Sequence, residues 1–524
     1  MSLLDFFRRI LRHLAAMLLF PSTLKAMPLS PKSSHPSVTV TETTDSLHSL
    51  DSLKDEIMRL FRQPCTMRRM MSMSSALRIQ YKAKMQDSQA CMLPSFCHSL
   101  PTGQEKGTFI ALDVGGSTFR IALVELRGRH AEDGSPMVIK HITSFKIDDS
   151  IRRLPSTQFF DWMASNIDGI LQLDKDLSSS DQIIPMGLAW SFPVEQTSHR
   201  GGKIQGMGKG FACHEDTLGK DLGQLLESAC TRRHLKVRVD AILNDSSATL
   251  LSQAYIDPAT SMGLILGTGT NIAAYLPVAA MGRSKFGSRD PSWFRKAERV
   301  ITNTEVSMFG KSILPETRWD EILNQQHPLP DFQPLEYMVS GRYLGEIFRL
   351  IVVEAVETGE LFSGVLPKSL RQSYSLDTEL MVRIEEDSSP HFAQSASLLK
   401  STFQLPCSPS EKEMSFLKVA AESISYRASA YMAVAVHALW ALQKDSDIKP
   451  TTAQGTPKTS VACNGSVILR YPGFKDRSEA FIKELIDMGS TGRPESTIEE
   501  IVLEPTDEAV VLGAAVAVAL ADDP

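Results

Sequence analysis

Two glycine turns, each followed by hydroxyl side chains, carry the clearest chemical signal in the chain. The first lies in GTFIALDVGGSTFRIALVEL (107–126) and the second in SMGLILGTGTNIAAYL (261–276), and each pattern predicts a β-hairpin. Glycine lets backbone N–H groups approach an anion closely, and serine or threonine adds a hydroxyl donor. One such hairpin could be an ordinary tight turn. Two copies favour two related lobes that face each other with phosphate groups between their turns.

Neither turn has the pattern of a P-loop or of a dinucleotide-binding fold. The chain has no GxxxxGK[ST] segment, and no GxGxxG segment opens a helix. We therefore expect opposed hairpins, rather than a helix N-terminus, to hold the phosphates.

An acidic residue lies between the two turns in the sequence. In VRVDAILNDSSATLLSQAYI (237–256), an apolar strand ends at Asn244-Asp245 and a helix follows. An aspartate at such a junction is often only a helix cap. Because the second glycine turn follows closely, Asp245 is also placed to accept a proton from a hydroxyl that attacks phosphorus. Both interpretations stay open from the residues alone.

Further polar residues suit hydrogen bonding to a ligand with many hydroxyl groups. In LAWSFPVEQTSHRGGKIQGMGKGF (188–211), a strand ends at Ser191, and Lys209 lies within Gly-x-Gly-Lys-Gly. Downstream, ITNTEVSMFG offers Asn303 and Glu305, and DFQPLEYMVSGRYLGE offers Glu336. Taken singly, each of these residues could equally be a cap or a solvated loop residue.

Length and composition indicate what must position these residues. A chain of 524 residues with 42% hydrophobic residues can bury at least two cores, so two lobes are expected. A net charge of −6 gives no support to general nucleic-acid binding. The seven cysteines are scattered and show no zinc spacing, which favours a reducing compartment. The segment SSPHFAQSASLLKSTFQLPCSPSEKE (388–413) is expected to be rich in loops.

The N-terminus differs in composition from the rest. MSLLDFFRRILRHLAAMLLF places apolar residues on one helical face beside three arginines, but its apolar run is too short to span a bilayer. A helix over 1–25 that targets mitochondria or anchors the chain on their outer surface is favoured over an amphipathic cap or a secretory signal. Residues 26–50 predict a disordered linker. A cytoplasmic protein is expected, and association with mitochondria stays an open alternative.

The order and spacing of these segments resemble the eukaryotic, fungal-type hexokinase family of the actin-like ATPase superfamily, from about residue 52 to the C-terminus. LDVGGSTFR is similar to the first phosphate loop of that family and LGTGTN to its second. SFPVEQTS and GKGF resemble its sugar-binding segment, LNDS resembles its catalytic element, and YPGF follows its adenosine segment. The chain resembles a divergent member of the family.

The resemblance implies an α/β protein with the two-lobed actin-like ATPase (ribonuclease H-like) fold, paired glycine-turn β-hairpins and a cleft between the lobes. Residues 51–247 would form the small-lobe region and residues 248–524 the large-lobe region, with the last helix returning to the small lobe. The lobes would close to keep water from competing with the sugar for the phosphoryl group.

The resemblance also implies that the substrates are a hexose and Mg-ATP, with no nucleic acid involved; it leaves the oligomeric state open. Asp245 would be the general base for the sugar 6-hydroxyl, Lys209 would also be catalytic, and Asp113 would act near Mg²⁺ through a water. The residues that would hold the sugar are Ser191, Phe192, Pro193, Lys209, Asn244, Asp245, Asn271, Glu305 and Glu336. Those that would hold the nucleotide are Asp113, Gly115, Gly116, Ser117, Thr118, Arg120, Gly267, Thr268, Gly269, Thr378, Gly465 and Ser466.

The chain departs from the family pattern at several positions. Gly208 replaces a threonine in the sugar loop, Val306-Ser307 replaces Trp-Gly, and Asn464 replaces an aspartate before Gly465. A Gly-Ser-Gly turn becomes Ala509-Val510-Val511. Because β-branched residues disfavour a turn with positive φ, the change at Val510 and Val511 predicts weaker nucleotide binding.

These observations predict ATP-dependent phosphorylation of a hexose at its 6-hydroxyl. Two alternatives stay open. The smaller residues Gly208 and Val306 could admit a 2-acetamido group, which would make the chain an N-acetylglucosamine kinase. The changed adenosine segment could instead leave a weakly active or inactive regulator that senses sugar.

Overall fold

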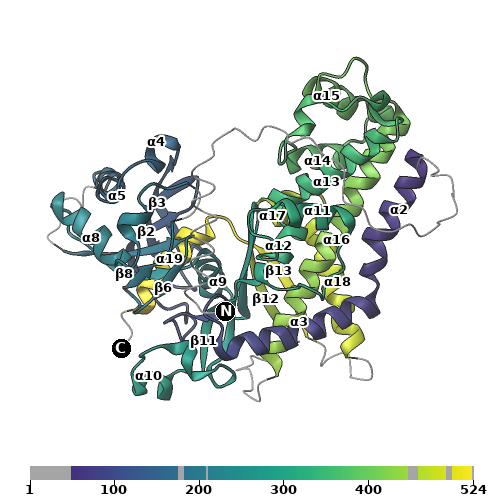
Figure 1. Ribbon diagram of the computed structural model, residues 1–524. Coiled ribbons are helices and arrows are strands. Elements are labelled where there is room, and N and C mark those ends of the chain that lie inside the picture. The colour runs from purple at the N-terminus through teal and green to yellow at the C-terminus, as the bar shows by residue number, and fades with distance from the viewer. Residues whose placement is uncertain (1–48, 175–181, 208–209, 446–457, 491–498, 522–524) are drawn as a thin grey trace, which may run out of the picture.

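The computed structural model describes residues 49–174, 182–207, 210–445, 458–490 and 499–521 (Figure 1). The predicted helix over 1–25 and all but the last two residues of the predicted linker lie outside this part of the chain, as do Gly208 and Lys209. The first described helix, α2 (Leu50–Arg62), begins at a cap in which the Ser49 hydroxyl accepts a hydrogen bond from the Ser52 amide.

Five strands form the sheet of the first lobe: β2 (Gly107–Val114), β3 (Thr118–Leu126), β4 (Met137–Lys146), β5 (Ile184–Trp190) and β8 (Val237–Leu243). Their order is β4-β3-β2-β5-β8, in which β4, β3 and β2 are antiparallel and β2, β5 and β8 are parallel. Apolar faces of α5 (Ser156–Leu171) and α8 (Leu222–Arg232) share one buried core with this sheet. The smaller elements here are α4 (Asp149–Arg152), β6 (Val194–Gln196), β7 (Gly202–Ile204) and α7 (His214–Thr217).

The second lobe repeats this strand plan. Its sheet contains β1 (Leu93–Pro94), β9 (Thr260–Leu266), β10 (Thr270–Pro277), β11 (Arg299–Asn303), β12 (Lys458–Asn464) and β13 (Glu500–Pro505). The order is β1-β11-β10-β9-β12-β13, in which β11, β10 and β9 are antiparallel and β9, β12 and β13 are parallel. The hairpins β2–β3 and β9–β10 therefore take the same place in the two sheets, which confirms the prediction of two related lobes with paired glycine-turn hairpins.

Helices surround the second sheet (Figure 1). The longest, α16 (Glu411–Lys444), packs against α2, α3 (Met67–Asp87), α14 (Thr378–Glu386) and α18 (Phe474–Gly489). The other α-helices are α10 (Pro291–Lys296), α11 (Arg318–Gln326), α12 (Pro334–Val339), α13 (Gly341–Glu357), α15 (Ala393–Phe403) and α17 (Ser466–Arg470). The 3₁₀ helices are η1 (Gln63–Cys65), η2 (Val278–Ala280), η3 (Arg283–Phe286), η4 (Val306–Met308), η5 (Leu361–Gly364), η6 (Lys368–Arg371) and η7 (Pro390–Phe392).

Within the stretch 388–413, which was expected to be rich in loops, residues 393–403 form helix α15 and residues 404–410 are not helical. The sequence of α15 is rich in serine, but Ala396, Leu399 and Phe403 lie on one face and are buried in the core of the second lobe. Burial of this face stabilises a helix that local composition did not indicate.

Helices α9 (Asp245–Ile256) and α19 (Ala509–Ala521) lie between the two sheets (Figure 1). Helix α19 packs against α9 and against β2, β3, β5 and β8, whereas α9 also packs against β9 and β10. A Cβ atom at Gly513 would lie 1.8 Å from the carbonyl oxygen of Ala248, so the backbones of the two helices are in contact at this point. The C-terminal helix thus belongs to the first lobe in space.

The structure corrects the expected turn at Val510 and Val511. Both residues lie in the first turn of α19, and both side chains are buried in the core that α19 shares with α9 and the first sheet. The positive φ angle falls instead on Glu508, where φ is 48°. A buried helical position suits valine, so these residues do not place a β-branched side chain in a strained turn.

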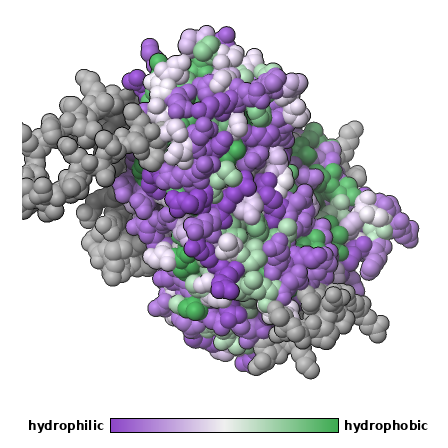
Figure 2. Space-filling model, turned by 90° about the vertical axis from the view of Figure 1, so that its right-hand side faces the viewer, coloured by the Kyte–Doolittle hydropathy of each residue, from purple (hydrophilic) through white to green (hydrophobic). Residues whose placement is uncertain are grey.

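Within the described residues, no helix is both long enough and apolar enough to cross a membrane. The face shown in Figure 2 is mostly hydrophilic, with hydrophobic residues in small groups. The large apolar side chains are instead collected in the cores of the two lobes.

The contact at Gly513 predicts a specific loss of stability. Replacing Gly513 with alanine forces α19 away from α9 and is expected to lower the free energy of unfolding by about 1–3 kcal/mol. Chemical denaturation measured by circular dichroism would test this. Gly169→Ala is the matched control, because Gly169 is an exposed glycine in α5 whose Cβ would meet nothing within 4 Å. It should be neutral or stabilising by up to about 1 kcal/mol, and equal stability of the two variants would contradict the prediction.

Candidate functional site

Many of the predicted site residues lie at the carboxyl ends of parallel strands in the two sheets. In the first sheet, β2 is followed by the first glycine turn, β5 by Ser191 and β8 by Asn244, and these strands are neighbours. In the second sheet, β9 is followed by the second glycine turn and β12 by Gly465, and these strands are also neighbours. The carboxyl ends of neighbouring parallel strands meet at one edge of a sheet, which brings together segments distant in sequence.

The first turn is fixed by hydrogen bonds to its backbone carbonyls. The Gly115 amide donates to the Thr118 carbonyl (3.0 Å), and the Ser117 carbonyl accepts from the Ile147 amide (2.8 Å). The Arg152 guanidinium donates to the Gly116 carbonyl (3.0 Å). Arg152 therefore adds a positive charge beside the proposed phosphate loop, a contact that the sequence patterns did not indicate.

The start of α13 holds the second turn. The Gly267 carbonyl accepts a hydrogen bond from the Gly341 amide (2.7 Å), and the Thr268 carbonyl accepts from the Ser340 hydroxyl (3.0 Å). The Gly267 amide donates across the turn to the Gly269 carbonyl (2.9 Å). Both turns thus have their carbonyls bonded to the protein, as an anion-binding loop requires if its carbonyl dipoles are to point away from the anion.

The proposed adenosine residues lie against the second turn. Gly465 has φ 117°, and a Cβ atom there would lie 2.4 Å from the Leu266 carbonyl oxygen, so only glycine fits. Thr378 lies at the start of α14; its hydroxyl donates to the Gly341 carbonyl and accepts from the Gly345 amide (3.0 Å). Thr378 is therefore linked to the second turn through Gly341, the same residue that bonds Gly267.

The hydrogen bonds at the start of α9 separate the roles of Asn244 and Asp245. The Asn244 side-chain oxygen is the helix cap, because it accepts from the Ser246 amide (2.9 Å) and hydroxyl (2.7 Å). Asp245 is the first residue of the helix, and its carboxylate also accepts from the Ser246 amide (2.8 Å). The capping role considered for Asp245 thus belongs mainly to its neighbour.

A chain of amide hydrogen bonds connects this helix start to the second lobe. The Asn271 amide nitrogen donates to the side-chain oxygen of Asn303 (2.8 Å) and, more weakly, to that of Asn244 (3.4 Å). Asn303 in turn donates to the Glu305 carboxylate (2.8 Å). The structure therefore brings together Asn244, Asn271 and Glu305, and Asn303, which the sequence also offered, links Asn271 to Glu305.

Three carboxylates influence one another at this point. Glu336, in α12, accepts a hydrogen bond from the Thr270 amide (2.9 Å) beside the second turn. Burial, together with the negative charges of Asp245 and Glu336, raises the pKa of Glu305 to about 7, although the hydrogen bond from the Asn303 amide opposes this shift. Three of the carboxylates proposed to hold the sugar, Asp245, Glu305 and Glu336, are thus close enough to affect one another's charge.

The residues predicted to hold the nucleotide include an ion-paired cluster. Arg120 donates to the buried Asp113 carboxylate through Nε (2.9 Å) and Nη2 (2.6 Å), and to Glu508 through Nη1 (3.0 Å). Burial raises the pKa of Asp113, and the Arg120 guanidinium opposes this shift. Glu508, which directly precedes α19, was not among the residues that the sequence suggested.

The segment after β5, which is predicted to bind the sugar, lies beside the end of β2. The Ser191 amide donates to the carbonyl of Val114 (3.1 Å). Val114 is the last residue before the first turn. Phe192 is buried and packs against Trp190 and Phe211, whereas Pro193 is exposed. Lys209 lies outside the described residues, so its proposed role stays a prediction.

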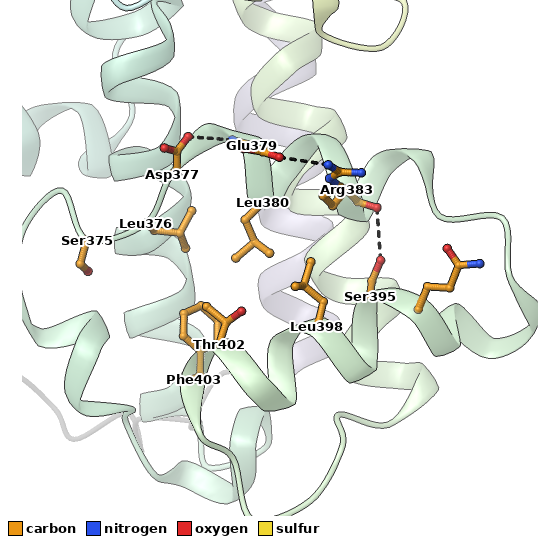
Figure 3. A pocket seen from close by; sticks show the side chains of 11 residues that line it. Ser375, Leu376, Asp377, Glu379, Leu380, Arg383, Ser395, Leu398, Thr402 and Phe403 are labelled. Atoms are coloured by element: carbon orange, nitrogen blue, oxygen red, sulfur yellow. Dashed lines mark hydrogen bonds and ion pairs between the residues drawn. The ribbon is translucent and has the colours of Figure 1, made fainter. Parts of the chain in front are cut away.

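A cavity of about 550 Å³ lies between α14 and α15 in the second lobe (Figure 3). Asp377 and Glu379 are among its lining residues, but Thr378 between them is not, because its hydroxyl bonds to α13. The cavity is therefore separate from the strand-end cluster described above.

Comparison with known proteins agrees with this geometry. Two family models, both described as hexokinase, match residues 56–255 and 261–520. Hexokinase-1 of Spinacia oleracea is 31% identical over 431 residues, which cover 82% of each chain. Hexokinase of Kluyveromyces lactis is 28% identical over 396 residues, which cover 75% of this chain and 77% of that protein.

Solved structures show the same fold. The hexokinase of Schistosoma mansoni, complexed with glucose, aligns with a TM-score of 0.72 at 24% identity over 90% of this chain and 99% of that one. A second hexokinase crystal structure aligns with a TM-score of 0.71 at 26% identity and the same coverage. The matched strand plan, the paired glycine turns and the family models together place this chain in the hexokinase family.

Proposed function

We propose that this chain is a sugar kinase that transfers the γ-phosphoryl group of ATP to the 6-hydroxyl of a hexose. The observation that carries the proposal is the convergence of the strand ends. Asp245 follows β8, which lies in the same sheet as the first glycine turn. The neighbouring residue Asn244 accepts a hydrogen bond from Asn271 in β10, the strand that follows the second turn. A carboxylate placed between two phosphate loops can act as base for in-line attack.

Charge is distributed in the way that this reaction needs. The carboxylates of Asp245, Glu305 and Glu336 lie on the acceptor side, where they can accept hydrogen bonds from sugar hydroxyls. The guanidinium groups of Arg120 and Arg152 lie beside the first turn, where they can interact with phosphate oxygens. In the proposed reaction Asp245 takes the hydroxyl proton while the glycine turns hold the phosphates.

The residues present fit Mg-ATP. In proteins, Mg²⁺ usually binds through one or two carboxylates, waters and substrate phosphates. Asp113 is a buried carboxylate in β2, the strand that ends at the first glycine turn, so it would supply the protein's carboxylate. When bound, the ion would neutralise charge that develops on the phosphates.

The burial of Val306 supports a hexose over N-acetylglucosamine. The alternative of a 2-acetamido substrate depends on free volume at Gly208 and Val306, and the Val306 side chain is fully buried in the core of the second lobe. The burial of Val510 and Val511 likewise weakens the argument for an inactive regulator, because these residues belong to a helix core and not to a strained turn.

Removing the base tests the proposed function. Asp245→Asn is expected to lower kcat by about 10²–10⁴-fold, since it removes the proton acceptor and keeps the shape of the side chain. A coupled assay of ADP release with glucose, fructose, mannose and N-acetylglucosamine measures this. Asp257→Asn, at the other end of the same helix, is the control and should keep normal turnover. Glucose binding without turnover of any sugar would support a regulator, and turnover of N-acetylglucosamine alone would overturn the hexose assignment.

The raised pKa of Glu305 predicts that sugar affinity depends on pH. With a pKa of about 7, the carboxyl binds a proton as the pH falls below neutrality. Hydroxyl donors of a sugar favour the ionised form, so binding releases this proton and affinity falls with falling pH. Calorimetric titration of glucose should show roughly tenfold weaker binding at about pH 6 than at about pH 7.5. Glu305→Gln should remove this dependence, and an equal slope in both proteins would contradict the prediction.

Association of residues 1–25 with the mitochondrial surface is a separate proposal. Its support is the basic, amphipathic pattern of this segment. A fluorescent reporter fused to residues 1–50 should colocalise with mitochondria, whereas a fusion in which Arg8, Arg9 and Arg12 are replaced by glutamine should not. Diffuse fluorescence of the first fusion would refute the proposal.

A further inference from the structure

Glu508 holds an unusual position next to the proposed phosphate site. It has a left-handed backbone conformation with φ 48°, and helix α19 begins at the next residue. Its carboxylate accepts a hydrogen bond from Arg120 Nη1 at 3.0 Å. Arg120 and Glu508 are 388 residues apart in sequence, so the packing of α19 on the first sheet brings them together.

The guanidinium of Arg120 is engaged by carboxylates on two sides. Nε and Nη2 donate to Asp113, and Nη1 donates to Glu508. Carboxylate and phosphate oxygens accept the same charge-assisted hydrogen bonds from arginine with similar geometry. The Glu508 carboxylate therefore takes the place on Nη1 that a phosphate oxygen of a nucleotide would take.

The two contacts of Arg120 differ in how readily they can open. The Asp113 side chain is only 10% exposed, so its pair with Arg120 is held in the interior. The Glu508 side chain is 41% exposed and that of Arg120 is 30% exposed. Glu508 can thus turn toward solvent by side-chain rotation while α19 stays packed, and such partly exposed pairs are weak.

We propose that Glu508 is an internal competitor for nucleotide phosphate, so that Mg-ATP must displace its carboxylate from Arg120 in order to bind. The inference rests on the proposed function in one respect, which is that Arg120 contacts phosphate. It predicts that Glu508, and not Val510 or Val511, lowers the affinity of this chain for Mg-ATP. The negative charge of Glu508 opposes phosphate binding even before the carboxylate is displaced.

Direct binding measurements test this inference. Calorimetric titration of Mg-ATP in the absence of sugar is expected to show about 3- to 10-fold tighter binding to Glu508→Gln than to the unsubstituted protein. The advantage should shrink at high salt, because screening weakens the pair. Asp507→Asn is the matched control: it removes the same charge from the adjacent, exposed residue and should change affinity less than about twofold.

A second variant separates competition from positioning. If Glu508 competes for Arg120, the gain from Glu508→Gln should be reduced in an Arg120→Ala background, which a double-mutant cycle measures. Equal or weaker Mg-ATP binding by Glu508→Gln would overturn the proposal, as would an unchanged gain in the Arg120→Ala background. Because binding is measured without sugar, a protein that phosphorylates no hexose would refute the proposed function and leave the test of Glu508 intact.

Discussion

The close contact between α9 and α19 sets the geometry on which the rest of the molecule depends. The backbone of Gly513 touches that of Ala248, and a Cβ atom at Gly187 in β5 would lie 2.2 Å from the carbonyl of Ala514, so α19 lies directly on both α9 and the first sheet. Asp245 begins one of these helices and Glu508 precedes the other. The contact between the two helices therefore positions both Asp245, the proposed base, and Glu508, which accepts a hydrogen bond from Arg120. A side chain at Gly513 would disturb both residues.

The site uses the repeated architecture in two different ways. In both lobes, the glycine turn of the hairpin (β2–β3 or β9–β10) has backbone carbonyls that accept hydrogen bonds from the protein, and its glycines lie beside neighbouring segments. Around these similar turns the charges differ: arginines lie beside the first turn, and carboxylates and amides lie between α9 and the second turn. Equivalent backbone loops can thus hold phosphate while the surrounding side chains keep the sugar and the phosphate apart by charge.

Parts of the fold could be predicted because the relevant signals are local. Glycine and hydroxyl residues between apolar runs indicate hairpin turns, and Asn244-Asp245 marks a strand-to-helix junction. The stretch over 388–413, expected to be rich in loops, contains helix α15, because Leu399 and Phe403 are buried against the second lobe. The strained turn expected at Val510 and Val511 was wrong because α19 already begins at Ala509, so that both valines are helical and the positive φ falls on Glu508.

By itself, the sequence determined which turns resemble the phosphate loops of the family and which acidic residue follows the central strand, since these features depend on residue types within short segments. The tertiary structure decided the partners of those residues. Asn303 joins Asn271 to Glu305 across two strands, Arg152 reaches the first turn from a separate helix, and Glu508 reaches Arg120 from the far end of the chain. Such contacts depend on how helices and sheets pack, and a pattern of neighbouring residues contains no information on distances between segments that meet only in the folded protein.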